Sequence, residues 1–319
     1  MSQLVPAWSF GPNMSQPRIE MNATILPSGK VLALGGSLND EDNNTASLNA
    51  DLYDPVANTF SSAGANSFPR LYHSVSLLLP DATVWVAGRN PARGSYQTQM
   101  EIYQPAYLFT RDPLGNVILA TRPGIASSPT TASYGSTFLV STPDANNISS
   151  IALIRAGAAT HAFDMDQRMV GLSFTNLGSG KLQVNAPANG NLAPPGYYML
   201  FLVNSSGVPS VAKWIQVRPR GSFKLAITPA SNTVTHGSTS TYTVAVIPAN
   251  GFQSTVNLAA QSPNARITVS ISPTSITPNG TSTLTVNVAA NATPGVYTVR
   301  VIGTNAQLSA TGKLTLTVQ

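Results

Sequence analysis

Cysteine is absent from the 319 residues, and charged side chains make up only 9% of them. The first absence excludes disulfide bonds within the chain and says nothing firm about its compartment. The formal net charge is +5, but the basic residues are scattered, and their closest grouping is Arg218 and Arg220 beside a proline. A nucleic-acid-binding surface needs clustered basic residues, so we do not expect one here.

Long hydrophobic runs are also missing. The longest compact run is YYMLFLV, residues 197–203, which is too short for a membrane-spanning helix and predicts a buried strand. The first ten residues, MSQLVPAWSF, lack the basic start and apolar core of a signal peptide. The polar, Thr/Asn-rich body is nevertheless typical of an exported bacterial protein. We therefore expect an extracellular or cell-surface location, and a natural N-terminus upstream of Met1.

What the chain has in abundance is turn formers and β-formers. It contains 24 Gly and 24 Pro, with much Thr, Ser, Asn and Val between them, a composition that predicts an all-β protein of many short strands. One segment occurs twice, as PRIEMNATILPSG (residues 17–29) and PRLYHSVSLLLPD (residues 69–81). The copies are 52 to 53 residues apart, close to the period of about 50 residues in kelch repeats, each of which forms one propeller blade.

Three domains follow from this pattern. Residues 1–120 are predicted to form about two blades of a kelch-type β-propeller, which cannot close a ring because propellers have about four to eight blades. Residues 121–219 change to short strands with new turn signals and predict a β-sandwich. Residues 220–319 contain seven alternating Thr/Val/Ser strands and predict an immunoglobulin-like β-sandwich. Its one histidine, His236, lies in a turn and is expected to be an exposed loop residue.

The candidate chemistry lies in the other two histidines. His73 follows Tyr72, and His161 lies 88 residues later in GAATHAFDMDQR. Neighbours in a regular strand point to opposite faces, so Tyr72 and His73 can share a metal only if the chain enters the strand irregularly, which Pro69 favours. Two imidazoles and a phenolate suit Cu(II), with zinc or iron also open. The alternative is a Tyr packed in a blade and a His bonded to a loop carbonyl.

A family resemblance strengthens the metal hypothesis. The motifs, in order, are RLYHSVSLLLPD (70–81), YQPAYLF (103–109), TRP (121–123), ALIRAGAATHAFDMDQR (152–168) and PPGYYMLFLVNSSGVPSVAKWIQV (194–217). Residues 10–217 closely resemble the C-terminal portion of galactose oxidase and glyoxal oxidase, the copper radical oxidases. The resemblance implies that Tyr72 is the axial tyrosine that accepts the substrate proton, and that His73 and His161 are equatorial copper ligands. It also implies oxidation of a primary alcohol or aldehyde, carried by a small molecule or a carbohydrate, by O₂ to give H₂O₂.

The chain departs from this family in one respect. The family's redox cofactor is a tyrosine cross-linked to a cysteine on early blades, and this chain has no cysteine. We therefore expect three copper ligands without the Tyr-Cys cofactor, and no oxidase activity unless missing blades or a partner chain complete the propeller. One alternative is half of a split propeller that needs such a partner. Another is a non-catalytic extracellular protein that serves binding or surface structure.

Several further residues carry weaker predictions. Asp164, Asp166 and Arg168 lie near His161 in the sequence and could orient its imidazole, or could form an ion pair that holds the loop. Trp85 aligns with Leu32 of the other copy, which predicts a position in the blade core. Tyr197 and Tyr198 flank the buried strand and are expected to pack there.

Overall fold

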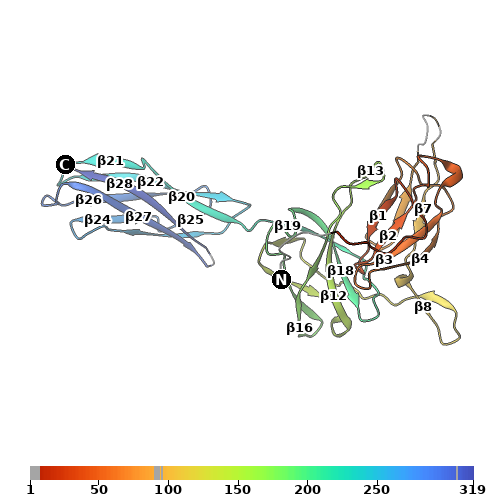
Figure 1. Ribbon diagram of the computed structural model, residues 1–319. Coiled ribbons are helices and arrows are strands. Elements are labelled where there is room, and N and C mark those ends of the chain that lie inside the picture. Colours follow the sequence, from red (N-terminus) through yellow and green to blue (C-terminus); the bar gives the residue numbers. More distant parts are fainter. Residues whose placement is uncertain (1–7, 90–93, 95, 307) are drawn as a thin grey trace. The chain divides into compact units, whose positions relative to one another are not determined.

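The computed structural model describes residues 8–89, 94, 96–306 and 308–319 (Figure 1). The regular structure of these residues is almost entirely β-strand, which confirms the predicted all-β class. Contacts divide the chain into two compact units, residues 1–218 and 219–319, and each is described by itself. The described helical segments are short 3₁₀ turns: η1 (Asn43–Thr45), η2 (Ala106–Leu108) and η3 (Ala145–Asn147). Within the described part of the chain, no helix has the length and apolar character needed to cross a membrane.

Each copy of the sequence repeat forms one antiparallel sheet. The first sheet has four strands in sequential order: β1 (Asn22–Ile25), β2 (Val31–Leu34), β3 (Asn49–Asp54) and β4 (Thr59–Ala65). The second has three: β5 (Val75–Leu78), β6 (Val84–Ala87) and β7 (Glu101–Tyr103). A separate hairpin, β8 (Phe109–Arg111) and β9 (Val117–Leu119), follows.

The two sheets pack face to face. Leu32 and Leu34 of the first sheet share a core with Val84 and Val86 of the second. Polar side chains join β1 to β5: the hydroxyl oxygens of Thr24 and Ser76 lie 2.6 Å apart, and Asn22 donates over 2.7 Å to Ser74, which directly precedes β5. Because apolar burial and these hydrogen bonds act between the same two sheets, the position of β5 beside β1 is strongly specified.

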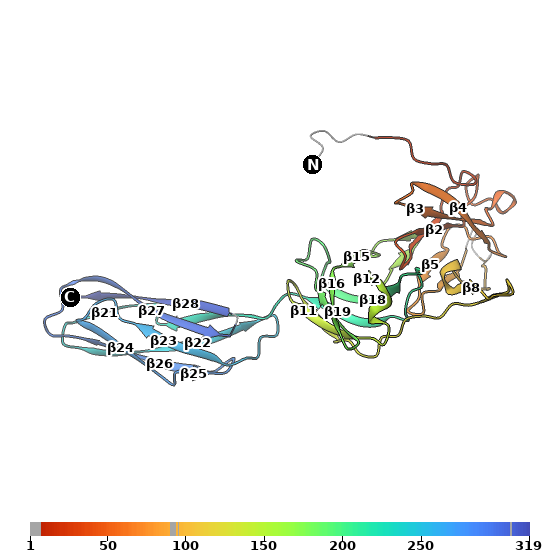
Figure 2. The same cartoon turned by 90° about the horizontal axis from the view of Figure 1, so that it is seen from below.

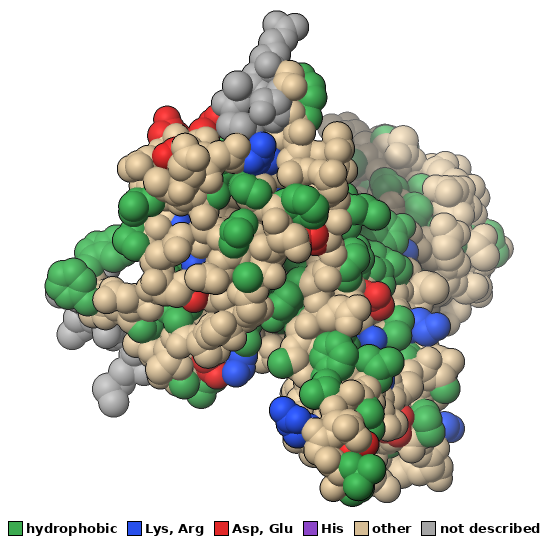
Figure 3. Space-filling view, turned by 90° about the vertical axis from the view of Figure 1, so that its right-hand side faces the viewer, with side chains coloured by type: hydrophobic (Ala, Val, Ile, Leu, Met, Phe, Trp, Pro, Cys, Tyr) green, Lys and Arg blue, Asp and Glu red, His purple; other side chains and the backbone are tan. Residues whose placement is uncertain are grey.

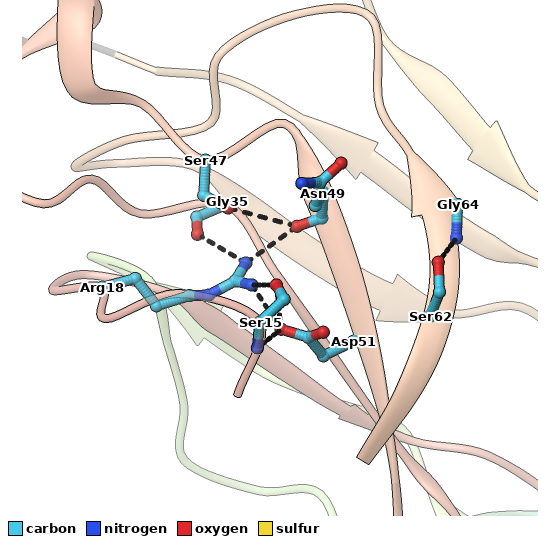
Figure 4. A network of polar contacts seen from close by, with 8 residues as sticks. All are labelled: Ser15, Arg18, Gly35, Ser47, Asn49, Asp51, Ser62 and Gly64. Carbon is cyan, nitrogen blue, oxygen red and sulfur yellow. Dashed lines mark hydrogen bonds and ion pairs between the residues drawn. The ribbon is translucent and has the colours of Figure 1, made fainter. Parts of the chain in front are cut away.

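Each of the two sheets is stabilised by its own buried arginine, and the two arginines occupy equivalent positions of the repeat. Arg18 forms an ion pair with Asp51, 2.5 Å apart, and also donates to the carbonyls of Gly35 and Asn49 (Figure 4). The second copy repeats this network with its equivalent residues: Arg70 pairs with Glu101 over 2.7 Å and donates to the carbonyls of Gly88 and Gln99. Burial alone would raise the pKa of Glu101, but hydrogen bonds from the Ser67 N–H and from Arg70 outweigh it and hold this pKa below its usual value.

Residues 122–217 form two packed sheets with a core between them. The larger sheet has the order β10-β19-β18-β12-β15 and the smaller has β11-β17-β16. Figures 1 and 2 show the long strands β12 and β18 side by side, and they pair along most of their length. The strands are β10 (Thr131–Ser133), β11 (Thr137–Ser141), β12 (Ile148–Arg155), β15 (Met169–Leu172), β16 (Phe174–Gly178), β17 (Lys181–Asn185), β18 (Gly196–Asn204) and β19 (Lys213–Arg218). A small hairpin, β13 (Ala159–Thr160) and β14 (Phe163–Asp164), leaves this sandwich between β12 and β15.

The second unit also has two sheets, with orders β20-β22-β26-β24 and β21-β28-β27-β23-β25, around a separate core. Its strands are β20 (Ser222–Thr228), β21 (Ser231–Val234), β22 (Thr239–Ala249), β23 (Val256–Gln261), β24 (Ile267–Ser272), β25 (Ser275–Ile276), β26 (Thr281–Val288), β27 (Gly295–Asn305) and β28 (Leu308–Val318). All seven strands predicted in this region are present. His236 is exposed, as predicted.

Two aromatic predictions, for Trp85 and Tyr197, were wrong. Trp85 is only partly buried and does not belong to the core, because Val84 and Val86 on either side of it face the first sheet and strand alternation turns Trp85 the other way. Its indole N–H donates to the sulfur of Met100. Tyr197 is 62% exposed, whereas Tyr198 is fully buried and donates to the carbonyl of Pro194.

Candidate metal centre

Tyr72 and His73 lie in a tight turn that enters β5. The turn is closed by a hydrogen bond of 2.9 Å from the Ser74 N–H to the Leu71 carbonyl. His73 has a φ of +62°, in the left-handed region that non-glycine residues seldom adopt. Tyr72 and His73 can share a metal only if the chain enters the strand irregularly, and this turn is such an entry. Adjacent side chains in a turn do not have to point to opposite faces as they do in a strand.

The segment that contains this turn is one residue longer than its equivalent in the first copy. The buried arginines Arg18 and Arg70 are 52 residues apart. The hairpins that follow them are 53 residues apart, because the Leu26 N–H donates to the Lys30 carbonyl as the Leu79 N–H donates to the Thr83 carbonyl. The second copy therefore has one more residue between its arginine and its hairpin. The extra residue falls in the segment that carries Tyr72 and His73.

Gly88 lets the second strand of the sheet approach this turn. A Cβ atom on Gly88 would lie 2.9 Å from the carbonyl oxygen of His73, closer than a side chain tolerates, and Gly88 itself has a φ of +76°. Both the close approach and the positive φ favour glycine. The backbone of His73 is thus fixed from the neighbouring strand.

His161 reaches the turn from the sandwich. It sits at the tip of the β13–β14 hairpin, where both His161 (φ +55°) and Ala162 (φ +59°) are left-handed. The Ala162 N–H donates to the Ser74 carbonyl over 3.3 Å, and β13 lies against β5 while β14 lies against β1. Non-glycine residues in this conformation cost of order 1–3 kcal/mol each and persist only where the surroundings enforce them.

The three rings meet at one place. The ring centroids of Tyr72 and His73 are 4.0 Å apart, those of His73 and His161 are 4.3 Å apart, and those of Tyr72 and His161 are 5.2 Å apart. The His161 ring is steeply inclined to both others, at 65° and 61°. His161 is exposed and the other two are partly exposed, so the cluster is open to solvent on one side.

The hydrogen bond of His161 leaves one ring nitrogen available. Its Nδ1 lies 2.7 Å from the hydroxyl of Thr160, which can accept from a protonated Nδ1. In that tautomer Nε2 carries the lone pair, as a metal-binding histidine requires.

The charged residues of the same loop contact other groups. Asp164 accepts from the backbone N–H groups of residues 158, 166 and 167. Asp166 forms an ion pair with Arg155 over 3.1 Å, and Arg168 donates to the carbonyls of residues 191 and 192. These contacts stabilise the loop, and the His161 ring is hydrogen-bonded to Thr160 instead. The orienting role predicted for the three charged residues stays a prediction.

The donor set fits a copper ion. It offers two imidazoles and a phenol, the nitrogen and oxygen ligands that Cu(II) accepts. Imidazoles on adjacent positions of one metal, each with a metal–nitrogen bond of about 2 Å, have ring centroids roughly 4 to 5 Å apart, which matches His73 and His161. Among the described residues no group of three or more His, Cys, Asp or Glu side chains could hold a metal, so tyrosine is an essential part of this set.

Two family models match stretches of this chain. Residues 1–107 match the family model of the glyoxal oxidase N-terminus, and residues 122–217 match that of the galactose oxidase-like early set domain. This part of the chain belongs to the galactose oxidase and glyoxal oxidase family. A galactose oxidase from Gibberella zeae is 38% identical over 201 residues, which cover 61% of this chain and 28% of that protein. Aldehyde oxidase GLOX from Vitis pseudoreticulata is 34% identical over 237 residues, which cover 67% of this chain and 44% of that protein.

A solved structure of a fungal alcohol oxidase of the AA5 family, in complex with copper, is also similar. The TM-score is 0.59 at 32% identity, with 64% of this chain and 43% of that chain covered. The chain thus spans less than half the length of these relatives.

The sequence did not point to three residues that lie around the candidate metal centre. Thr160 was overlooked although a hydroxyl directly before a histidine is a plausible partner for it. Gly88 could have been found, because the repeat aligns it with Gly35. Gln167 had no sequence signal, because its partners lie on a strand more than 140 residues away.

Proposed function

We propose that residues 1–217 supply part of the mononuclear copper site of a secreted oxidase. Tyr72, His73 and His161 are the ligands. The observation that carries the proposal is the meeting of these three rings, which come from two segments 88 residues apart and have positive φ at both histidines. Strained backbone kept at one cluster of metal-binding side chains is typical of a functional site.

The complete protein is proposed to oxidise a primary alcohol or an aldehyde. For an alcohol the balanced reaction is RCH₂OH + O₂ → RCHO + H₂O₂. Copper, held by Tyr72, His73 and His161, would supply one-electron redox chemistry at this site. The phenolate oxygen of Tyr72 accepts the proton of the substrate hydroxyl and becomes a phenol. His73 and His161 fix the geometry of the site, and the open side of the cluster admits the substrate.

The second oxidising equivalent has to come from outside these 319 residues. The chain contains no cysteine, so it cannot form the family's Tyr-Cys cross-link by itself.

We propose that the first two sheets are the last blades of a kelch-type propeller in residues 1–120. Residues 121–219 are the family's sandwich domain, and residues 220–319 are an immunoglobulin-like module.

Copper titration with histidine variants tests the ligand assignment. His161→Ala removes one of two imidazoles and should weaken Cu(II) binding by at least about 100-fold, more than loss of a residue that only orients a ligand. His236→Ala is the matched control, because His236 is an exposed loop histidine in the other unit. Equal affinity of the His161→Ala and His236→Ala proteins, or no tight Cu(II) binding by the unaltered chain, would reject the copper proposal.

A second candidate is a split propeller whose remaining blades come from a partner chain. One face of the second sheet favours it: Trp85 is partly exposed there, and Met100 and Ile102 are 65% and 45% exposed. The first sheet buries the equivalent Leu32 against the second, so a further sheet would cover Trp85 in the same way. Figure 3 shows one face of the molecule, on which hydrophobic side chains are scattered among backbone and other side chains, with acidic and basic side chains between them. A native mass that contains a second, different chain would support this candidate, and a monomer with copper-dependent oxidase activity would exclude it.

A further inference from the structure

β1 is an edge strand of the first sheet, and among the described residues the side chain of Gln167 binds its outer edge. β1 pairs with β2 on one side only, through Thr24 and its alternate neighbours. The N–H and C=O groups of Ala23 and Ile25 therefore point away from β2, as alternate residues of a strand do. Unpaired groups of this kind normally bind another strand or water.

Gln167 binds this edge with both ends of its carboxamide. Its Oε1 accepts from the Ile25 N–H over 2.9 Å, and its Nε2 donates to the Ala23 carbonyl over 2.6 Å. An amide that accepts from residue i+2 and donates to residue i reproduces the backbone of a neighbouring strand. The side chain is partly buried, so water competes weakly for these bonds.

Gln167 belongs to the loop that carries His161. Asp164 Oδ1 accepts the N–H groups of Ala158 and Gln167, which ties the start of the loop to its end. The same loop donates the Ala162 N–H to Ser74, beside His73. The hairpin is therefore rigid within itself and is attached at two points, to the first sheet through Gln167 and to the second through Ala162.

We propose that Gln167 is the positioning residue that sets His161 against His73. Its two hydrogen bonds fix the position of the β13–β14 hairpin along β1. After a shift of one residue, Gln167 would face backbone groups of β1 that point to β2 and could not bind them. The copper consequence rests on the proposed function. The docking of the hairpin does not, because it needs only the contacts described here.

The test replaces Gln167 by methionine in the 319-residue chain. Methionine keeps the length of the side chain and loses both hydrogen bonds, and Gln183→Met in β17 of the sandwich is the matched control. Two lost hydrogen bonds should speed amide exchange of Ile25 about 30-fold, equivalent to about 2 kcal/mol. The nuclear Overhauser effect between the ring protons of His73 and His161, whose centroids are 4.3 Å apart, should disappear.

Copper provides a separate spectroscopic readout. With Cu(II) bound, the unaltered chain and Gln183→Met should show hyperfine splitting from two imidazole nitrogens, and Gln167→Met should show one, with affinity lower by about 10- to 30-fold. Retention of the His73–His161 Overhauser effect in Gln167→Met overturns the proposal, even if Ile25 exchanges faster. If the unaltered chain binds no copper, the proposed function fails. The metal-free exchange and Overhauser measurements still decide the role of Gln167.

Discussion

Replacement of Gly88 by alanine isolates the support that the second sheet gives to His73. The new Cβ would lie 2.9 Å from the His73 carbonyl oxygen and 3.6 Å from the Ser74 Cα. The first distance is too short, and the atom in the way is backbone, so it cannot rotate aside. The carbonyl has to move by a few tenths of an ångström, and the imidazole of His73 moves with it.

The cost has two parts that a control variant separates. Alanine at the φ of +76° costs about 1–2 kcal/mol, the usual penalty for a residue with a Cβ in the left-handed region. The collision with His73 adds about 1–3 kcal/mol, as overpacking does. Gly115 in the β8–β9 hairpin has a φ of +84°, and no atom lies within 4 Å of the position that a Cβ would take there, so Gly115→Ala incurs only the first part.

Chemical denaturation and Cu(II) titration of both variants provide the assay. We expect Gly88→Ala to lose about 2–5 kcal/mol of unfolding free energy and at least about tenfold in copper affinity, the equivalent of about 1.4 kcal/mol. Gly115→Ala should lose about 1–2 kcal/mol and keep its copper affinity. Copper affinities of Gly88→Ala and the unaltered chain that agree within about twofold would refute the argument that Gly88 positions His73.

Two further predictions concern stability. The pKa of Glu101 is lowered in the folded state from 4.5, so its carboxylate stabilises the fold above pH 4.5, and this stabilisation is lost as the pH falls through the lowered pKa. Glu101→Gln should lower the unfolding free energy at pH 7 by about 1–3 kcal/mol and flatten its decline in acid, measured by urea denaturation from about pH 7 to 3; an equally steep acid limb would contradict this. Residues 219–319 have a hydrophobic core of their own and should unfold cooperatively as an isolated fragment, with a calorimetric midpoint close to that in the full chain. A fragment without a cooperative transition would show that this unit depends on residues 1–218.

The sequence alone determined the strands and the candidate ligands. Alternation of apolar and polar side chains has a period of two in a strand, so local pattern placed β1, β2 and the seven long strands of the second unit. The repeat also singled out Tyr72 and His73 as the place where its two copies differ. The family resemblance added His161, which no local pattern connects to them.

Only the tertiary structure decided how these parts meet. Packing between the two sheets chose which face of β6 is buried, and so turned Trp85 outward where alignment with Leu32 predicted core. The β13–β14 hairpin brings His161 to His73 because Gln167 and Ala162 bind backbone groups of two different sheets. A backbone group has the same chemistry at every position, so contacts of this kind leave no trace in the residue they bind, and the sequence could not reveal them.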